Sequence, residues 1–182
     1  MTPRDAQDPV LSTAAVMFLQ DNRVDMQALS KLAGLSRATL YRRYGDRGQL
    51  LGAAFWQFAE PVITELRAGI REEGLRGAEA VAEQVGRSLH FVAEIPQVRN
   101  AMKHNAEQTL RVMTSKHGIV QRGLVAFTTE MIIEEIGDPD IPPATLAYGV
   151  VRIGESFFYR ELITGEPQDI DSAILLIRKL LS

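Results

Sequence analysis

The sequence contains no cysteine in 182 residues. This absence excludes a disulfide framework, a thiolate metal site and a cysteine nucleophile, and it fits a reducing compartment. Histidine is also scarce. The three histidines are His90, His104 and His117, and no two of them stand at the short helical spacing of a histidine metal site. We therefore expect no metal and no cofactor, and interpret most histidines as structural or surface residues.

Long apolar runs are missing as well. The most apolar stretch, Leu146 to Phe158, is interrupted by Arg152 and Glu155, so no segment has the length and composition of a membrane span. The segment Met1 to Asp8 is short and polar, without the basic and apolar regions of a secretory signal peptide. These absences predict a cytoplasmic protein with no membrane partner.

Recognisable enzyme motifs are absent too. The sequence has no G-x-S-x-G nucleophile motif, no glycine-rich phosphate loop and no paired carboxylates in a recognisable frame. We expect no catalytic residues and no enzymatic activity.

Helical periodicity is what the sequence does contain. Hydrophobic residues make up 46% of the chain and charged residues 24%, as in a folded globular protein, and no segment alternates apolar and polar residues over a useful length. We predict an all-α fold of about nine helices. Their expected spans are Pro9 to Leu19, Met26 to Ala33, Arg37 to Tyr44, Arg47 past Trp56 to Arg71, Ala78 to Glu94, Pro96 to Leu110 or Met113, Ile119 to Ile136, Ala144 to Thr164 and Ile170 to Leu180.

The segment from Val24 to Leu51 carries the clearest functional pattern. It reads VDMQALSKLAGLSRATLYRRYGDRGQLL. Asp25 and Ser36 are suited to cap two short helices, and Gly34 supplies the left-handed residue of a tight turn between them. Two short helices joined in this way predict a helix-turn-helix, whose second helix can enter a DNA major groove.

The predicted second helix displays a chemistry suited to DNA. At about 100° per residue, Leu40 and Tyr44 face inward, while Ala38, Thr39 and Arg42 face outward. Charge supports this orientation, because residues 1–50 hold seven basic and five acidic residues, whereas the rest of the chain holds thirteen and eighteen. The alternative is a helical hairpin whose arginines form an ordinary solvated face.

Residues 10–58 resemble the N-terminal module of the TetR family of bacterial regulators, most specifically in the run AGLSRATLYRRYGDRGQLL. Tyr44 stands where the family usually has phenylalanine, and Asp25 where threonine or serine is usual. The resemblance implies a DNA-binding domain at residues 1–48 and a helical effector-binding and dimerisation domain at residues 49–182. It implies DNA contacts from the exposed residues of the second helix and a phosphate contact from the next helix, so the expected set is Ser36, Arg37, Thr39, Tyr41, Arg42 and Arg47.

The C-terminal part is similar to a narrower group, the QsdR-like regulators, in HFVAEIPQVRNAMKHNAEQTLRVMTSKHGIVQ and YGVVRIGESFFYRELITGE. That similarity implies a γ-lactone effector. The candidate apolar ligand contacts are Phe91, Met113, Val120, Phe127 and Tyr148, and the candidate polar contacts are His104, Asn105, Arg152 and Glu155. Arg152 and Glu155 have a second interpretation as an ordinary buried ion pair.

The segment 144–164 is apolar nearly all round and must be covered on both sides, which predicts a homodimer. The sequence as a whole favours a ligand-responsive regulator, more often a repressor in this family, that binds palindromic operator DNA and is released by a small molecule. The alternatives are a helical adaptor that does not bind DNA and a small-molecule-binding protein.

Overall fold

The computed structural model describes residues 7–21, 23–114 and 118–182, so residues 1–6 and His117 lie outside the described part. Within it the chain is all-α and has no strand, as predicted. The helices are α1 (Pro9–Asp21), α2 (Met26–Leu32), α3 (Arg37–Tyr44), α4 (Arg47–Glu72), α5 (Gly77–Glu94), α6 (Pro96–His104), α7 (Ala106–Met113), α8 (Ile119–Ile136), α9 (Pro143–Phe158), α10 (Arg160–Thr164) and α11 (Ile170–Leu180).

The predicted start and stop signals of the first helices are confirmed. The Asp25 carboxylate accepts hydrogen bonds from the amides of Gln27 and Ala28 at the start of α2. Gly34 has a φ of 64°, which a residue with a Cβ adopts only at a cost. Asp46 and Gln49 form a reciprocal capping box at the start of α4. Local side-chain chemistry therefore sets these boundaries.

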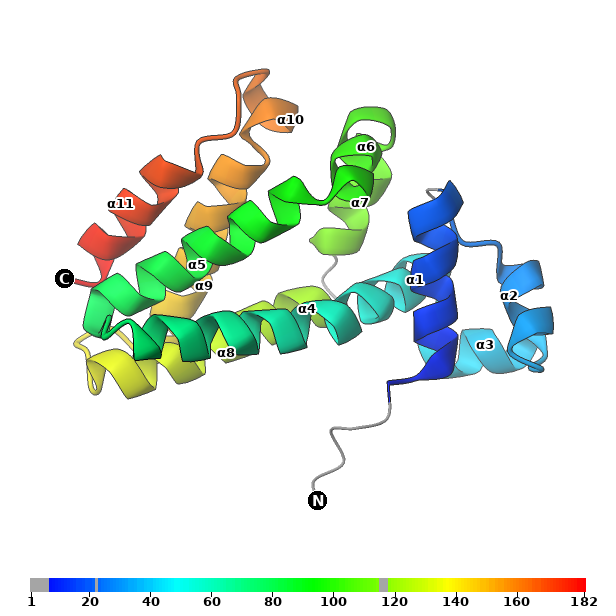
Figure 1. The fold of residues 1–182 in the computed structure, drawn as a ribbon, viewed down its shortest axis with the longest axis horizontal. Coiled ribbons are helices and arrows are strands. Elements are labelled where there is room, and N and C mark those ends of the chain that lie inside the picture. The colour runs from blue at the N-terminus through cyan, green and yellow to red at the C-terminus, as the bar shows by residue number, and fades with distance from the viewer. Residues whose placement is uncertain (1–6, 22, 115–117) are drawn as a thin grey trace.

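Helix α4 is the longest element and continues through Pro61 without a break. Its 26 residues correspond to about 39 Å. It runs through the middle of the molecule, from the group formed by α1, α2 and α3 to the turn before α5 (Figure 1). Helix α5 then returns alongside α4 and packs also against α8 and α11. One rigid helix thus joins the two ends of the fold.

Two segments that we expected to be single helices are divided, which gives eleven helices in the described part in place of about nine. Residues 96–113 break at Asn105, where φ is −138° and ψ is 42°. Residues 144–164 break at Tyr159, whose ring packs edge to face on Phe158 at 5.2 Å between centroids. Neither break contains proline or glycine, so packing in the folded chain sets them and local sequence does not.

The N-terminal helices share a core with a later part of the chain. Leu29, Leu40 and Leu50 are completely buried in this core, and Ala101 of α6 and Val112 of α7 belong to it. A second core lies between α5, α8, α9 and α11 and contains residues such as Ile132 and Ile177. The core of the N-terminal helices is therefore completed by residues of α4, α6 and α7.

The two leucines of α2 differ in burial. Leu29 is completely buried, whereas Leu32 is 70% exposed. It occupies the last position of α2, immediately before the turn at Ala33 and Gly34.

No helix in the described part of the chain is long and apolar enough to cross a membrane.

Candidate functional site

Helices α2 and α3 form the helix-turn-helix that the sequence predicted. The backbone amide of Leu35 bonds to the Ser30 carbonyl at 3.0 Å and closes the turn. Ser36 then caps α3, because its Oγ accepts a hydrogen bond from the Thr39 amide at 3.1 Å. Leu40 is completely buried beneath α3. The turn, the cap and this one apolar anchor fix the direction of α3.

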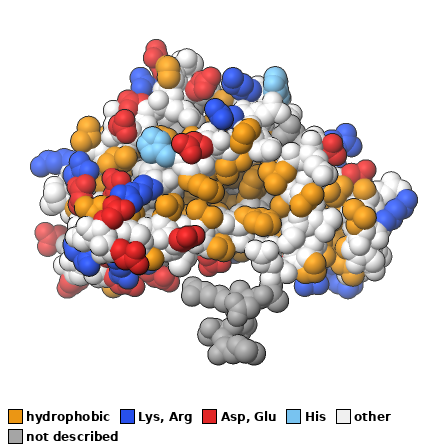
Figure 2. Space-filling view, viewed as in Figure 1, with side chains coloured by type: hydrophobic (Ala, Val, Ile, Leu, Met, Phe, Trp, Pro, Cys, Tyr) orange, Lys and Arg blue, Asp and Glu red, His pale blue; other side chains and the backbone are white. Residues whose placement is uncertain are grey.

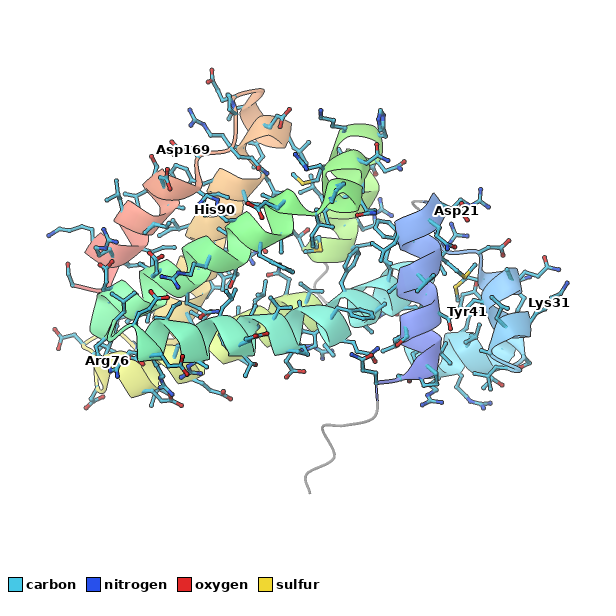
Figure 3. The ribbon with its side chains drawn as sticks, in the orientation of Figure 1. Asp21, Lys31, Tyr41, Arg76, His90 and Asp169 are labelled. Carbon is cyan, nitrogen blue, oxygen red and sulfur yellow. The ribbon has the colours of Figure 1, made fainter. Side chains whose placement is uncertain are left out.

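The outer surface of α3 collects the residues predicted to meet DNA. Arg37, Ala38 and Arg42 are exposed, and Tyr41 is 42% exposed. Thr39 is half-buried, with its hydroxyl 2.9 Å from the Ser36 Oγ. Lys31 of α2 and Tyr41 of α3 lie at one end of the molecule, whereas Arg76 lies at the opposite end (Figure 3).

Arg47 is the exposed first residue of α4. It is also part of the walls of two neighbouring cavities, which the sequence analysis did not predict.

A polar cluster around Asp8 ties α3 to α1 and α4. The Tyr44 hydroxyl and the Arg43 guanidinium both donate to Asp8 Oδ2, at 2.8 and 3.3 Å, and the Asp8 amide donates to Gln57 Oε1 at 2.8 Å. Burial and the hydrogen bond to Asp8 raise the pKa of Tyr44 to about 12. The departure from phenylalanine at position 44 therefore has a bonding partner in this chain.

A cavity of about 510 Å³ opens between the N-terminal helices and the rest of the fold. Its volume lies within the usual range for small-molecule sites. Figure 2 shows hydrophobic side chains gathered around a hollow in the centre of this face. The walls come from α1, α4, α5, α6, α7, α8 and α9, and include Phe18, Leu51, Trp56, Leu89 and Phe158.

The candidate ligand residues divide between this cavity and other places. Phe91, Asn105, Met113, Val120 and Glu155 are on the cavity wall.

The other four candidates are not on that wall. His104 lines a separate, more polar groove between α4 and the junction of α6 with α7. Phe127 packs against the second core, with the Arg67 guanidinium 5.4 Å from its ring centroid. Tyr148 is 57% exposed, and the Arg152 guanidinium lies 5.2 Å from its ring centroid.

Arg152 and Glu155 form an ion pair, with Arg152 Nη2 2.7 Å from Glu155 Oε2. Gln121 of α8 accepts a hydrogen bond from Arg152 and donates to Glu155, and it also donates to the Met113 carbonyl at 2.6 Å. Burial raises the pKa of Glu155, although Gln121 and Arg152 favour its ionised form. Glu155 is thus both an ion-pair partner and a cavity-wall residue.

Several cavity residues were missed at the sequence level. Tyr159 is buried and on the cavity wall, and burial followed by the charge of Glu155 raises its pKa. Trp56 and Arg23 also belong to the wall, and Gln121 lies just behind it. The only sequence signal for these wall residues was the single tryptophan on the apolar side of a long helix.

In the part of the chain that the structure describes, no cluster of side chains could hold a metal ion.

Comparison with known proteins agrees with this architecture. Residues 76–182 match the family model described as tetracyclin repressor-like, C-terminal domain. No curated protein sequence matches the chain.

Two solved structures resemble the whole chain. One is the transcriptional repressor QsdR of the TetR family from R. erythropolis, with a TM-score of 0.81 and 26% identity over 95% of this chain and 92% of that chain. Another is the TetR family repressor AlkX from Dietzia sp. strain DQ12-45-1b, implicated in biodegradation of n-alkanes, with a TM-score of 0.65 and 25% identity over 99% of this chain and 94% of that chain. The family model covers more than half of the sequence, and both folds match along nearly the full length. The chain therefore belongs to the TetR family of transcriptional regulators.

Proposed function

We propose that this protein is a ligand-responsive repressor that binds a palindromic operator as a homodimer and is released by a small molecule in the 510 Å³ cavity. The observation that carries the proposal is the outer surface of α3. Arg37, Tyr41 and Arg42 are exposed there, while the helix is anchored from beneath by the completely buried Leu40. A rigidly held helix with a basic outer face is what reading a major groove requires.

The individual residues have distinct roles in this proposal. Arg37 and Arg42 offer donors to phosphates and guanine edges, and Tyr41 offers a phenol to the backbone or to a base. Thr39 and Ser36 lie at the start of the helix, where hydroxyl groups reach the DNA backbone. Arg47 contacts a phosphate from the start of α4. The region 1–48 is then the DNA-reading part, and residues 49–182 carry ligand binding and dimerisation.

The homodimer is supported by apolar side chains left uncovered on the last helix. Leu175, Leu176 and Leu180 are exposed on α11, although Ile177 on the same helix is completely buried within the protomer. A contiguous apolar face next to a buried one suits a symmetric helix-packing interface. Two copies related by a two-fold axis would present two α3 helices to a palindromic site.

The DNA-reading part and the C-terminal part both contribute to the cavity wall, so a ligand in the cavity can affect their relative position. Phe18, Val24 and Arg47 of the N-terminal part are on its wall together with Met113 and Glu155 of the C-terminal part. A ligand that fits one relative position of these parts better than another would shift the population toward it. The QsdR-like resemblance favours a γ-lactone, whose ring carbonyl would accept a hydrogen bond from Tyr159.

The test is selection of bound sequences from a random duplex pool with the full-length protein. We expect enrichment of a palindromic sequence whose affinity falls steeply with salt, because phosphate contacts release counterions. Arg42→Ala should weaken binding to the selected duplex by about 1–3 kcal/mol, equivalent to about five- to 150-fold. Arg76→Ala, at the opposite end of the molecule, is the matched control and should leave affinity unchanged. Recovery of no sequence, or equal effects of the two variants, would refute the proposal.

A further inference from the structure

The wall of the 510 Å³ cavity is apolar over most of its extent but includes two arginines. Arg23 lies in the segment between α1 and α2, and Arg47 is the first residue of α4. Both side chains line the cavity, and both residues are exposed, so the two guanidinium groups stand where the cavity meets solvent. Among the described residues, neither makes an ion pair.

Nearby acidic groups leave these arginines available. Hydrogen bonds from the Ala28 and Gln27 amides lower the pKa of Asp25, and the charges of Arg23 and Arg47 lower it further, so both arginines lie near this one carboxylate. Asp25 is already occupied as the cap of α2. Asp46, which precedes Arg47, is likewise occupied as the cap of α4. Both arginines are therefore available to an anionic group at the mouth.

The cavity extends far from this mouth. Its wall includes residues of α4 from Arg47 to Ile63, a distance of about 24 Å along a helix. Phe55, Phe58 and Val62 lie between them on the same wall. This shape suits a long apolar chain laid along α4, and not a compact polar molecule.

The second charged group on the wall fixes the orientation of such a ligand. Glu155 is on α9, and its carboxylate bonds to Arg152 and Gln121, neither of which is on the wall. Glu155 and Arg152 pair with each other, so this part of the wall offers no free cation to an anionic head. Arg23 and Arg47 would attract such a head. The charges therefore place an anionic head at the mouth and the chain in the interior.

We propose that the cavity binds a single-chain amphiphile with an anionic head, which Arg23 and Arg47 hold at the mouth. This inference rests on the proposed function of a ligand-released repressor, and it replaces the neutral γ-lactone with an anionic effector. Arg47 would then have two partners that exclude each other, because a guanidinium that binds the ligand head cannot bind a DNA phosphate at the same time. The ligand would then oppose DNA binding by direct competition as well as by a shift of conformation.

The experiment compares dodecanoate with its uncharged methyl ester, each below its aggregation limit, on the full-length protein. Trp56 is the only tryptophan of the chain and is on the cavity wall, so its fluorescence reports occupancy. Dodecanoate should bind about three- to tenfold more tightly than methyl dodecanoate at low salt, and added salt should narrow the difference. Equal affinities for the two probes would overturn the inference, whatever the variants do.

Substitution of one arginine tests where the anionic head of the ligand binds. Arg23→Gln should weaken dodecanoate binding by about three- to tenfold and leave the ester within about twofold. Arg76→Gln, remote from the cavity, should alter neither. An equal loss for both probes in Arg23→Gln would contradict the head site. γ-Dodecalactone serves as the neutral comparison, and tighter binding of the lactone than of dodecanoate would also overturn the inference.

DNA binding by the unliganded protein is measured in parallel, so that the two proposals fail separately. Specific DNA binding with no response to dodecanoate would refute the amphiphile and leave the repressor proposal in place. Absence of specific DNA binding in the unliganded protein would refute the repressor itself.

Discussion

The hydroxyl of Tyr44, in the last turn of α3, donates a 2.8 Å hydrogen bond to Oδ2 of Asp8, the residue immediately before α1. The same Asp8 uses Oδ1 to accept the Val10 amide and so begins α1. One carboxylate therefore joins the end of the predicted DNA-reading helix to the start of the first helix. The orientation of α3 depends on this link in addition to the buried Leu40.

Tyr44→Phe should reduce the free energy of unfolding by about 1 kcal/mol, because it removes one partly buried hydrogen bond. Asp8 retains Arg43, and its side chain is 22% exposed, so no buried charge is left isolated. Urea denaturation measures the loss, and Tyr41→Phe on the exposed face of α3 is the control. A Tyr44→Phe protein as stable as the parent would show that the link adds nothing.

The same pair has a predictable pH dependence. The folded-state pKa of Tyr44, about 12, is above its ordinary value of 10.0, so the neutral phenol is the form that folding favours. The stability difference between the parent and Tyr44→Phe should be constant below pH 10 and should disappear as the pH rises through about 12. A difference that grew in this range would have the wrong sign.

Two glycines should respond to alanine in opposite directions. At Gly34 a Cβ would meet no atom within 4 Å, but φ is +64°, so Gly34→Ala should destabilise the fold by about 1 kcal/mol through backbone strain alone. Gly69 lies inside α4 with equally open space and no positive φ, so Gly69→Ala should stabilise by about 0.5–1 kcal/mol. Denaturation of the two variants side by side checks both signs.

Leu176→Glu should convert the proposed dimer into a monomer, because it places a charge on the exposed apolar face of α11. Light scattering after size-exclusion chromatography gives the mass directly. Leu32→Glu is the matched control, since Leu32 is also an exposed leucine but lies on α2. A parent protein with the mass of one chain at micromolar concentration would contradict the dimer.

Glu155→Gln should reveal the cost of ionising a carboxyl group in the cavity wall. Burial raises the folded-state pKa of Glu155 above the ordinary value of 4.5, so folding favours its protonated form. Relative to the glutamine variant, the parent should lose stability as the pH rises from about 4.5 through that raised pKa. Denaturation at a series of pH values measures the difference, and a rising relative stability would show that the ion pair with Arg152 dominates.

Gly123→Ala should disturb the cavity through Trp56. A Cβ at Gly123 would lie 2.3 Å from the Trp56 ring, so the ring must move, at a cost of about 1–3 kcal/mol. We expect a shift of tryptophan emission and altered ligand affinity. Gly86→Ala is the control, because its Cβ would meet Cδ1 and Cγ1 of Ile174, at 2.3 and 2.7 Å, and not the tryptophan ring. Unchanged emission in Gly123→Ala would exclude the predicted ring movement.

The sequence predicted those parts of the fold that local chemistry determines. Asp25, Ser36 and the Asp46–Gln49 pair act through neighbouring amides, so α2, α3 and α4 begin where the pattern placed them. The breaks at Asn105 and Tyr159 depend on packing between distant segments, and no local signal marks them.

The same distinction applies to the candidate site. The exposed face of α3 follows from the period of one helix, so its outward residues could be predicted. The cavity is assembled from seven helices, and its wall depends on how they cross. Of the candidate ligand contacts, Phe91, Met113 and Glu155 lie on the wall, whereas Tyr148 is 57% exposed beside Arg152. Arg23 and Tyr159 belong to the wall only because of how the helices pack, and no local sequence pattern predicts that.

The shared core of the N-terminal helices bears on how such regulators can be recombined. Because Ala101 and Val112 are buried in that core, a fragment ending at residue 48 would expose apolar surface that the full chain covers. A chimera that exchanges only the DNA-reading helices would inherit a mismatched core, to which α4, α6 and α7 also contribute. New operator specificity is therefore better introduced by changing the outer residues of α3 in place, because these make no contribution to the joint between the two parts.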